Sequence, residues 1–504
     1  MRRLAAFGLA AGCSVAGLAS TGCRTAAPVR SEPPPVAKAA PATPIRHASA
    51  QAPSDDKLAR AEVSVPEREA NIDLAYALEV AGAANPTIAL ARETVVEARA
   101  RQKQAYALIL PNLNAGANVR IHTGPVQRSP GTILDVSSQS LYFGSGARAV
   151  GTGTVAIPGI RAVYPLADVV LGRRLVQQRV AAVRGDSVAV QNLTLLDVAT
   201  AYLELLGADA ALEALRHSEA EFAEIARLTA QYAKAGQGRD ADACRAEANL
   251  ELLRRESQEV RGERAAASAR LAGMLSLDPT QALIPPGGRL YPLGFFDPAT
   301  DLDSLAAQAL QARPEVNARA AEVAESGIRL RQEKLRPWLP TVGVGFSAGS
   351  FGGGSDLTAS SYGGFGGRTD FDLFAVWTVQ NLGLGNRALQ NRGRAHVGQA
   401  VARLDSAQNR IRAEVAESLA QIRSARSRIE TARSQLATAQ QGFGEEMARI
   451  KQDEGRPLEV LDSTRQLGES RLELIRAITG HNVAQFRLLA AVGTPPDRVT
   501  PTSR

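Results

Sequence analysis

One uninterrupted helical pattern limits what this chain can fold into more than any other feature. From Gly385 to Ile450 there is no proline, and a large apolar residue recurs at every seventh position, namely Val415, Ile422, Ile429, Leu436, Phe443 and Ile450. Three positions after the large residues stand Ala425, Ala432 and Ala439, so large and small side chains alternate along one coiled-coil seam. At 1.5 Å per residue, a helix of about 65 residues spans roughly 100 Å. Such a helix does not fit a compact globule, and it predicts a rod or the wall of a tube.

The long helix belongs to a duplicated architecture, with a first half at residues 67–290 and a second half at 291–493. Each half carries a helix, a strand-like run, a loop, a second strand-like run, a long helix, a glycine turn and another long helix. The spacing of prolines repeats, because Pro86 and Pro111 are 25 residues apart and Pro314 and Pro340 are 26 apart. The long helix of the first half is expected at about 172–235. A period this long indicates a domain duplication and not a solenoid.

Apolar and polar residues alternate in the strand-like runs. Val344 and Phe346, for example, alternate with Gly345 and Ser347, and a similar series follows Leu113. A period of two predicts strands with one apolar and one polar face. Return strands are expected near 150–164 and 370–379, with loops at about 123–149 and 349–369. Two interpretations stay open on the strands alone, namely membrane strands facing lipid and water or a soluble hairpin with one wet face.

The first 22 residues are predicted to be a secretory signal peptide, because a basic start precedes an apolar stretch. Its end, Gly22-Cys23, resembles a bacterial lipoprotein signal with an acylated cysteine, although Ser20 stands where that pattern usually has an aliphatic residue. Residues 23–66, rich in Pro and Ala, are expected to be a lipid-anchored linker, and residues 494–504 a disordered tail. In the alternative, an ordinary signal peptidase cleaves the chain and Cys23 is passive.

The composition argues against several function classes. The chain has 58 Lys and Arg against 51 Asp and Glu, and the excess of seven is spread along it, which gives no indication of nucleic-acid binding. Three cysteines exclude a disulfide framework, and the five histidines lack the spacing of metal ligands. Residues 345–349 match the G-x-S-x-G pattern of hydrolases, but a glycine-rich stretch follows where that chemistry needs a helix. We therefore expect no enzymatic activity, no metal and no cofactor.

Over about 70–493 the order of motifs resembles the TolC family of outer-membrane efflux proteins. The resemblance rests on the duplicated halves, on Asn85-Pro86 and Arg313-Pro314-Glu315, and on the stretches 197–203, 414–419 and 455–462. It implies a mainly α-helical fold with some β-structure, in which each of three chains contributes four strands to a 12-stranded membrane β-barrel. The long helices would form a hollow cylinder across the periplasm. The implied partners are two further copies, outer-membrane lipid, a periplasmic adaptor protein and an inner-membrane transporter.

The resemblance places function at the ends of this tube. Gly236 and Gly455 would be the turns at the periplasmic tips. Family members carry an acidic pair after the second tip, and Glu459 and Asp462 match that place, with Glu standing for one of the usual Asp residues. Three chains would bring six carboxylates together as an electrostatic gate.

Asp242 stands at the matching place in the first half and is the next gate candidate. We expect it to act more weakly, because Arg245 occupies the position three residues later. In the alternative interpretation, Glu459 and Asp462 are only a solvated acidic helix start that is stabilised by the helix dipole.

The resulting hypothesis is a passive outer-membrane exit duct of a tripartite export system. One alternative in the same family is the outer component of a type I protein secretion system. Another, of a different class, is a periplasmic coiled-coil scaffold whose hairpins never enter lipid. The cargo is not readable, because a water-filled tube needs no tight substrate pocket.

Overall fold

The computed structural model describes residues 69–147, 157–236, 238–286, 290–357, 364–452 and 457–498. The predicted signal peptide, Cys23, the predicted linker, Gly455 and the tail beyond Arg498 lie outside the described residues. The chain divides into two units, Met1–Ser64 and Val65–Arg504, and all described residues belong to the second.

The helices of the two halves match in order and in length. In the first half α1 (Leu74–Ala84), α2 (Pro86–Ala107), α3 (Leu166–Lys234) and α4 (Asp240–Met274) have 11, 22, 69 and 35 residues. In the second half α5 (Leu302–Ala312), α6 (Pro314–Leu335), α7 (Leu384–Lys451) and α8 (Pro457–Ala491) have 11, 22, 68 and 35. Both predicted long helices are therefore present, and each spans roughly 100 Å.

A proline separates the two short helices of each half. Because proline disfavours a helical conformation in the residue before it, Asn85 and Arg313 are extended. Asn85 also caps α2, since its Oδ1 accepts hydrogen bonds from the N–H groups of Thr87 and Ile88 at 2.8 and 3.4 Å. Among the described residues no single helix is long and apolar enough to span a membrane, and α1 with α2, bent by 41°, meets that criterion only as a pair.

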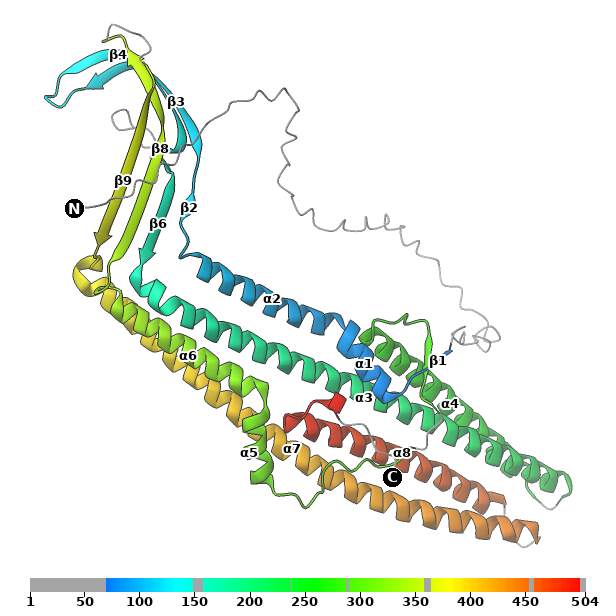
Figure 1. Ribbon diagram of the computed structural model, residues 1–504. Coiled ribbons are helices and arrows are strands. Elements are labelled where there is room, and N and C mark those ends of the chain that lie inside the picture. Colours follow the sequence, from blue (N-terminus) through cyan, green and yellow to red (C-terminus); the bar gives the residue numbers. More distant parts are fainter. Residues whose placement is uncertain are drawn as a thin grey trace, which may run out of the picture. The chain divides into compact units, whose positions relative to one another are not determined.

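The long helices lie side by side (Figure 1). Next to the sheet their order is α2, α3, α6, α7, and farther from it the order is α4, α3, α8, α7. The predicted seam of α7 is buried where it packs, because Val415, Ile422 and Ile429 are at most 4% exposed. The alternating Ala425 and Ala432 are buried as well. The heptad interpretation is confirmed over this stretch.

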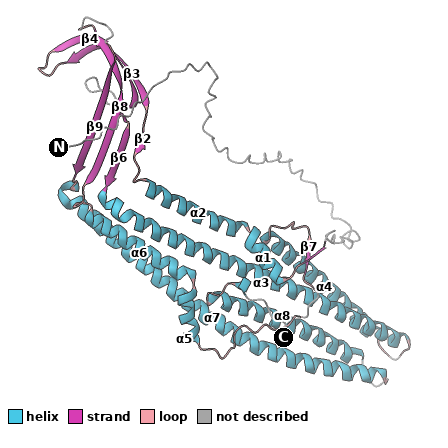
Figure 2. Cartoon of the chain, in the orientation of Figure 1, coloured by secondary structure: helices cyan, strands magenta, loops and turns pink. Residues whose placement is uncertain are grey.

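Over the described residues the main sheet has seven strands, seen at the end of α2, α3, α6 and α7 in Figure 2. They are β2 (Asn112–Leu113), β3 (Gly116–Gln127), β4 (Ile133–Ala147), β5 (Ile157–Pro158), β6 (Ile160–Pro165), β8 (Thr341–Ser355) and β9 (Gly366–Val376). A separate two-stranded sheet pairs β1 (Glu69–Asn71) in parallel with β7 (Ala282–Ile284).

The antiparallel register arranges the main strands in four rows. One edge of β8 pairs with β9, and its other edge pairs first with β6 and then with β4, which follow one another along it. In the outermost row β2 pairs with β6 and β3 pairs with β4. The rows are therefore β9, β8, β4 with β6, and β3 with β2.

The predicted loops are partly wrong. Much of the segment 123–149 is a β-hairpin, since β3 continues to Gln127 and β4 begins at Ile133, well before the return strand expected from residue 150. Likewise β8 continues through the glycines to Ser355. Strand pairing supplies the backbone hydrogen bonds here, whatever the local propensity.

Glycines extend β8 because they leave room for aromatic rings of β9 and of the residue just before it. A Cβ on Gly343 would lie 2.1 Å from the ring of Phe374, and one on Gly352 would lie 2.8 Å from the ring of Phe365. The glycine-rich composition, which suggested a loop, thus reflects packing within the sheet.

Candidate functional site

The first functional surface is the apolar face of the sheet. Val344 lies beside Leu373 on one side and Ala162 on the other, and Phe346 lies beside Phe371 in the next pair of that face. Further apolar residues follow in register on the outer rows and are exposed, among them Leu113, Val119, Ile121, Phe143 and Ile160. Leu373 and Phe371 are 67% and 68% exposed. Exposed apolar area of this extent on one face indicates a surface that is normally covered.

The opposite face of the sheet is polar. Gly345 lies between Arg161 and Asp372 in the register. Next to them, Arg368 donates to Asp370 at 3.0 Å. Charged groups thus alternate with the apolar residues along the same strands, as the period of two predicts.

Ser347 of the hydrolase-like pattern lies on this polar face, in the middle of β8. Its hydroxyl donates to Asp370 at 3.4 Å. The strand–turn–helix geometry that a nucleophile elbow requires is not formed there, because the strand continues to Ser355.

The second functional surface is the end of the helices away from the sheet. A hydrophobic cluster joins all four helices there: Phe222 and Ile225 of α3, Ala246 and Leu250 of α4, Ile450 of α7, and Val460 and Leu461 of α8. Gly236, placed at a tip turn by the sequence, follows α3 with a φ of +76°, a conformation that favours glycine.

The proposed gate carboxylates stand in the first two turns of α8 and are exposed. Glu459 lies 3.8 Å from the guanidinium of Arg449 on α7. Asp462 accepts a hydrogen bond of 2.9 Å from Arg465 and one of the same length from Gln466. In the single chain, therefore, each carboxylate has an arginine beside it.

Asp242 resembles Asp462 more closely than the sequence reasoning expected. Arg245 lies 3.8 Å from Asp242, and Arg465 occupies the same i+3 position relative to Asp462. The contrast that remains is Glu459, because the residue three positions before Asp462 is acidic and the residue three positions before Asp242 is Arg239. The signal was present in the sequence, because an i+3 arginine is a local feature.

Two contacts that the sequence did not predict join the two helical hairpins, which are α3 with α4 and α7 with α8, near their tips. Arg471 of α8 holds Glu221 of α3 through two hydrogen bonds of 2.6 and 2.9 Å, and both side chains are less than a third exposed. Tyr232, at the end of α3, donates to the backbone carbonyl of Ile450 at 3.2 Å. Any separation of the two hairpins has to break both contacts.

A third missed feature is an ion cluster in the helix wall, near the α5–α6 break. The guanidinium of Arg313 lies 2.8 Å from Glu315 and also binds Glu414 on α7. The Arg313 side chain is only 7% exposed. The two sequence motifs that contain Arg313 and Glu414 therefore meet in space.

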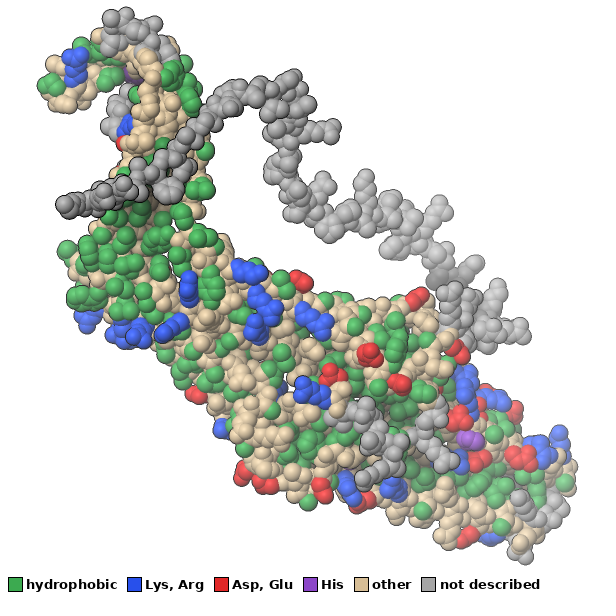
Figure 3. Space-filling view, in the orientation of Figure 1, with side chains coloured by type: hydrophobic (Ala, Val, Ile, Leu, Met, Phe, Trp, Pro, Cys, Tyr) green, Lys and Arg blue, Asp and Glu red, His purple; other side chains and the backbone are tan. Residues whose placement is uncertain are grey.

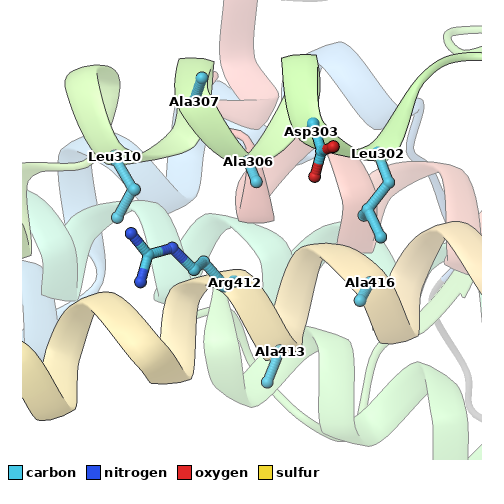
Figure 4. Close-up of a pocket in the computed structure, with 8 residues that line it drawn as sticks. All are labelled: Leu302, Asp303, Ala306, Ala307, Leu310, Arg412, Ala413 and Ala416. Carbon is cyan, nitrogen blue, oxygen red and sulfur yellow. The ribbon is translucent and has the colours of Figure 1, made fainter.

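A shallow groove of about 500 Å³ lies between α5 and α7 (Figure 4). Leu302, Ala306 and Leu310 of α5 point towards α7 in Figure 4, with Arg412 below Leu310 and Ala416 below Leu302. Among the described residues no group of three or more His, Cys, Asp or Glu side chains is suited to hold a metal ion.

Known proteins share features with this chain. Residues 305–494 match the model of the family described as outer membrane efflux protein. No curated protein has a matching sequence. The sequence pattern of the family thus lies in the second half of the chain.

Solved structures share the fold over both halves. A membrane protein from Pseudomonas aeruginosa is similar with a TM-score of 0.68 and 19% identity, over 83% of this chain and 93% of that one. CusC, described in connection with transmembrane channel formation, is similar with a TM-score of 0.67 and 19% identity, over 84% and 92%. The CmeC outer membrane channel of Campylobacter jejuni gives 0.66 at 13% identity, over 83% and 85%. Residues 305–494 thus carry the sequence pattern of the outer membrane efflux protein family, and both halves of the chain share the fold of solved outer-membrane channel proteins.

Proposed function

We propose that the protein is the passive exit duct of a tripartite export system in the outer membrane. Three copies would close one 12-stranded barrel and one helical tube, through which solutes leave the periplasm. An inner-membrane transporter supplies the energy, and a periplasmic adaptor joins it to the helix tips. The duct itself carries out no reaction.

The observation that carries this proposal is the pair of open edges of the sheet. Within the described residues β9 pairs with β8 alone and β3 pairs with β4 alone, so each outer row has a free edge. Free strand edges are not tolerated in lipid, and copies of the same chain can close them edge to edge. The helices offer equivalent edges, α7 on one side and α2 with α4 on the other.

The apolar face argues for lipid and against the periplasmic scaffold. A hairpin in water would keep one polar face outward, whereas here Val119, Ile121, Phe371 and Leu373 are exposed together. The polar face with Arg161, Asp370 and Asp372 would then line the water-filled lumen.

Reconstitution tests the duct. We expect the purified full chain to run as a trimer in native mass spectrometry and to produce discrete conductance steps in a planar bilayer. A monomer that remains water-soluble without detergent and conducts nothing would support the scaffold.

The gate prediction concerns Glu459 and Asp462. Replacing both by Ala removes six carboxylates from the proposed trimer, and it leaves Arg449 paired with Glu446 alone and Arg465 paired with Glu469 alone. We expect the preference for cations to fall severalfold and the block by divalent cations to disappear, as measured from reversal potentials and single-channel currents.

Glu259→Ala with Glu263→Ala is a matched control, because both acids are exposed on α4 and lie well along that helix from the tip. The control should keep both properties. If the Glu459→Ala/Asp462→Ala variant also keeps them, these residues only stabilise the start of α8 and the gate lies elsewhere.

We also propose that Cys23 is acylated and anchors the mature N-terminus. A single acyl chain binds a membrane only marginally, so the barrel must supply most of the attachment. Cys23→Ala should therefore slow maturation without releasing the protein. Mass spectrometry that finds an unmodified Cys23 at the mature N-terminus would contradict acylation.

A further inference from the structure

Although the excess of basic residues is spread along the sequence, in the folded chain many basic residues come together where the helices meet the sheet. Acidic residues are missing from three long stretches there, between Glu97 and Asp135, between Glu333 and Asp356, and between Asp372 and Asp405. The ends of α2, α3, α6 and α7 next to the sheet carry many basic residues, namely Arg99, Arg101, Lys103, Arg173, Arg174, Arg329, Arg331, Lys334, Arg336, Arg387, Arg392 and Arg394. We call these twelve residues the basic collar. In Figure 3 Lys and Arg side chains gather directly beneath the sheet.

The few acids inside the collar are already neutralised. Asp168, in the first turn of α3, accepts a hydrogen bond of 2.9 Å from Arg336, and Glu333 lies 3.6 Å from the same guanidinium. Arg174, Arg331 and Lys334 have no such partner among the described contacts and are exposed. The collar therefore presents uncompensated positive charge.

In the proposed ring of three copies, a neighbouring copy would not cover the part of the collar that lies on α3 and α6. Next to the sheet α3 and α6 are flanked within the chain, α3 by α2 and α6 by α7. Only the outer edges of α2 and α7 remain for another copy. Arg174 on α3 and Lys334 on α6 therefore stay exposed in a closed ring.

Tryptophan accompanies the collar. The chain has two tryptophans, Trp338 and Trp377, and they are 78% and 60% exposed. Trp338 lies seven residues after Arg331 and four after Lys334, a spacing that places the three side chains on one face of a helix. The chain remains helical to this point, because the backbone N–H of Leu339 donates a hydrogen bond to the carbonyl of Leu335. Trp377 directly follows β9 and continues the apolar series of Phe371 and Leu373.

We propose that the basic collar and the two tryptophans bind the anionic phospholipid headgroups of the periplasmic leaflet, and so fix the depth of the sheet in the membrane. This inference rests on the proposed function, because it takes the apolar face to be covered by lipid. Indole rings favour the boundary between headgroups and acyl chains, and arginine and lysine just outside it bind phosphate. A tryptophan exposed to a water-filled lumen would gain neither contact.

Fluorescence tests the position of Trp338. Trp377→Phe leaves Trp338 as the only tryptophan, and the variant is reconstituted in vesicles of equal parts phosphatidylcholine and phosphatidylglycerol. We expect bromine near the carbonyl end of the acyl chains to quench Trp338 more strongly than bromine near the chain end. Trp338→Phe reports on Trp377 in the same way. Quenching of Trp338 by aqueous iodide and not by brominated lipid would overturn the proposal.

Lipid retention tests the charges. Arg331→Gln with Lys334→Gln should weaken retention of phosphatidylglycerol about 30-fold in native mass spectrometry, and leave retention of phosphatidylcholine unchanged. Arg433→Gln with Arg487→Gln removes the same charge from exposed sites on α7 and α8 away from the sheet, and should have no effect.

The remaining outcomes distinguish a lipid headgroup from free phosphate as the bound anion, and they distinguish failure of this inference from failure of the proposed function. Displacement of phosphatidylglycerol by inorganic phosphate at equal concentration would show a site for free anions and overturn the lipid assignment. A change in ion preference with normal lipid retention would place Arg331 and Lys334 in the lumen, and would also overturn it. A chain that inserts and conducts without lipid preference refutes only this inference, whereas one that never inserts refutes the proposed function.

Discussion

Val344→Arg should prevent stable assembly of the trimer in a bilayer. Val344 lies on the apolar face between Leu373 and Ala162, and an arginine there would carry its charge into lipid. The cost is about 2–4 kcal/mol per chain at the bilayer midplane and falls towards the interfaces, and the trimer multiplies it by three. Urea titration of the protein folded into phosphatidylcholine vesicles measures the loss.

Gly345→Arg is the matched control, because it places the same side chain one residue away on the polar face. A Cβ at Gly345 has its nearest neighbours 3.6 Å away, at the side chain of Asp372. Gly343 would be a poor control, since the ring of Phe374 fills its space. We expect Gly345→Arg to assemble much better than Val344→Arg. Equal losses, or a greater loss at Gly345, would mean that the two faces have been assigned the wrong way round.

Arg313→Ala should destabilise the helix wall by about 3 kcal/mol or more. The substitution leaves Glu315, which is 14% exposed, without the guanidinium that neutralises it, and also releases Glu414. Removing one partner of a buried ion pair is costly, because the remaining charge stays desolvated. Thermal unfolding of the detergent-solubilised protein, followed by circular dichroism, should show a lower midpoint.

Arg227→Ala is the control for this variant. Arg227 also makes two hydrogen bonds to a carboxylate, that of Glu224, but this pair lies on the exposed surface of α3. Solvent screens such pairs, and many contribute nothing measurable. If Arg313→Ala unfolds at the same temperature as Arg227→Ala, the Arg313 cluster is not a structural joint between α6 and α7.

Secondary structure with a strong period was readable from the sequence. The heptad seam through Val415, Ile422 and Ile429 predicted α7 almost to its ends, because helix formation depends on contacts three and four residues apart. The sequence analysis expected one helix before the first strand of each half, whereas the structure has two, because Pro86 and Pro314 each act on the residue before them. Asp462 and Arg465 lie three residues apart on one helix, so their pairing also depends only on neighbours along the chain.

The strand ends and the long-range contacts were decided by the tertiary structure. β4 begins at Ile133 because its backbone pairs with β3 and β8, and the glycines of β8 remain in the sheet because rings such as that of Phe374 pack against them. Arg471 meets Glu221 across 250 residues of sequence, and no local pattern marks either residue. By itself the sequence determined the long helices, their duplication and the alternating faces, because these depend on neighbours along the chain. Only the packing of distant segments decided which strands pair, which charges are buried and where the basic helix ends meet the sheet.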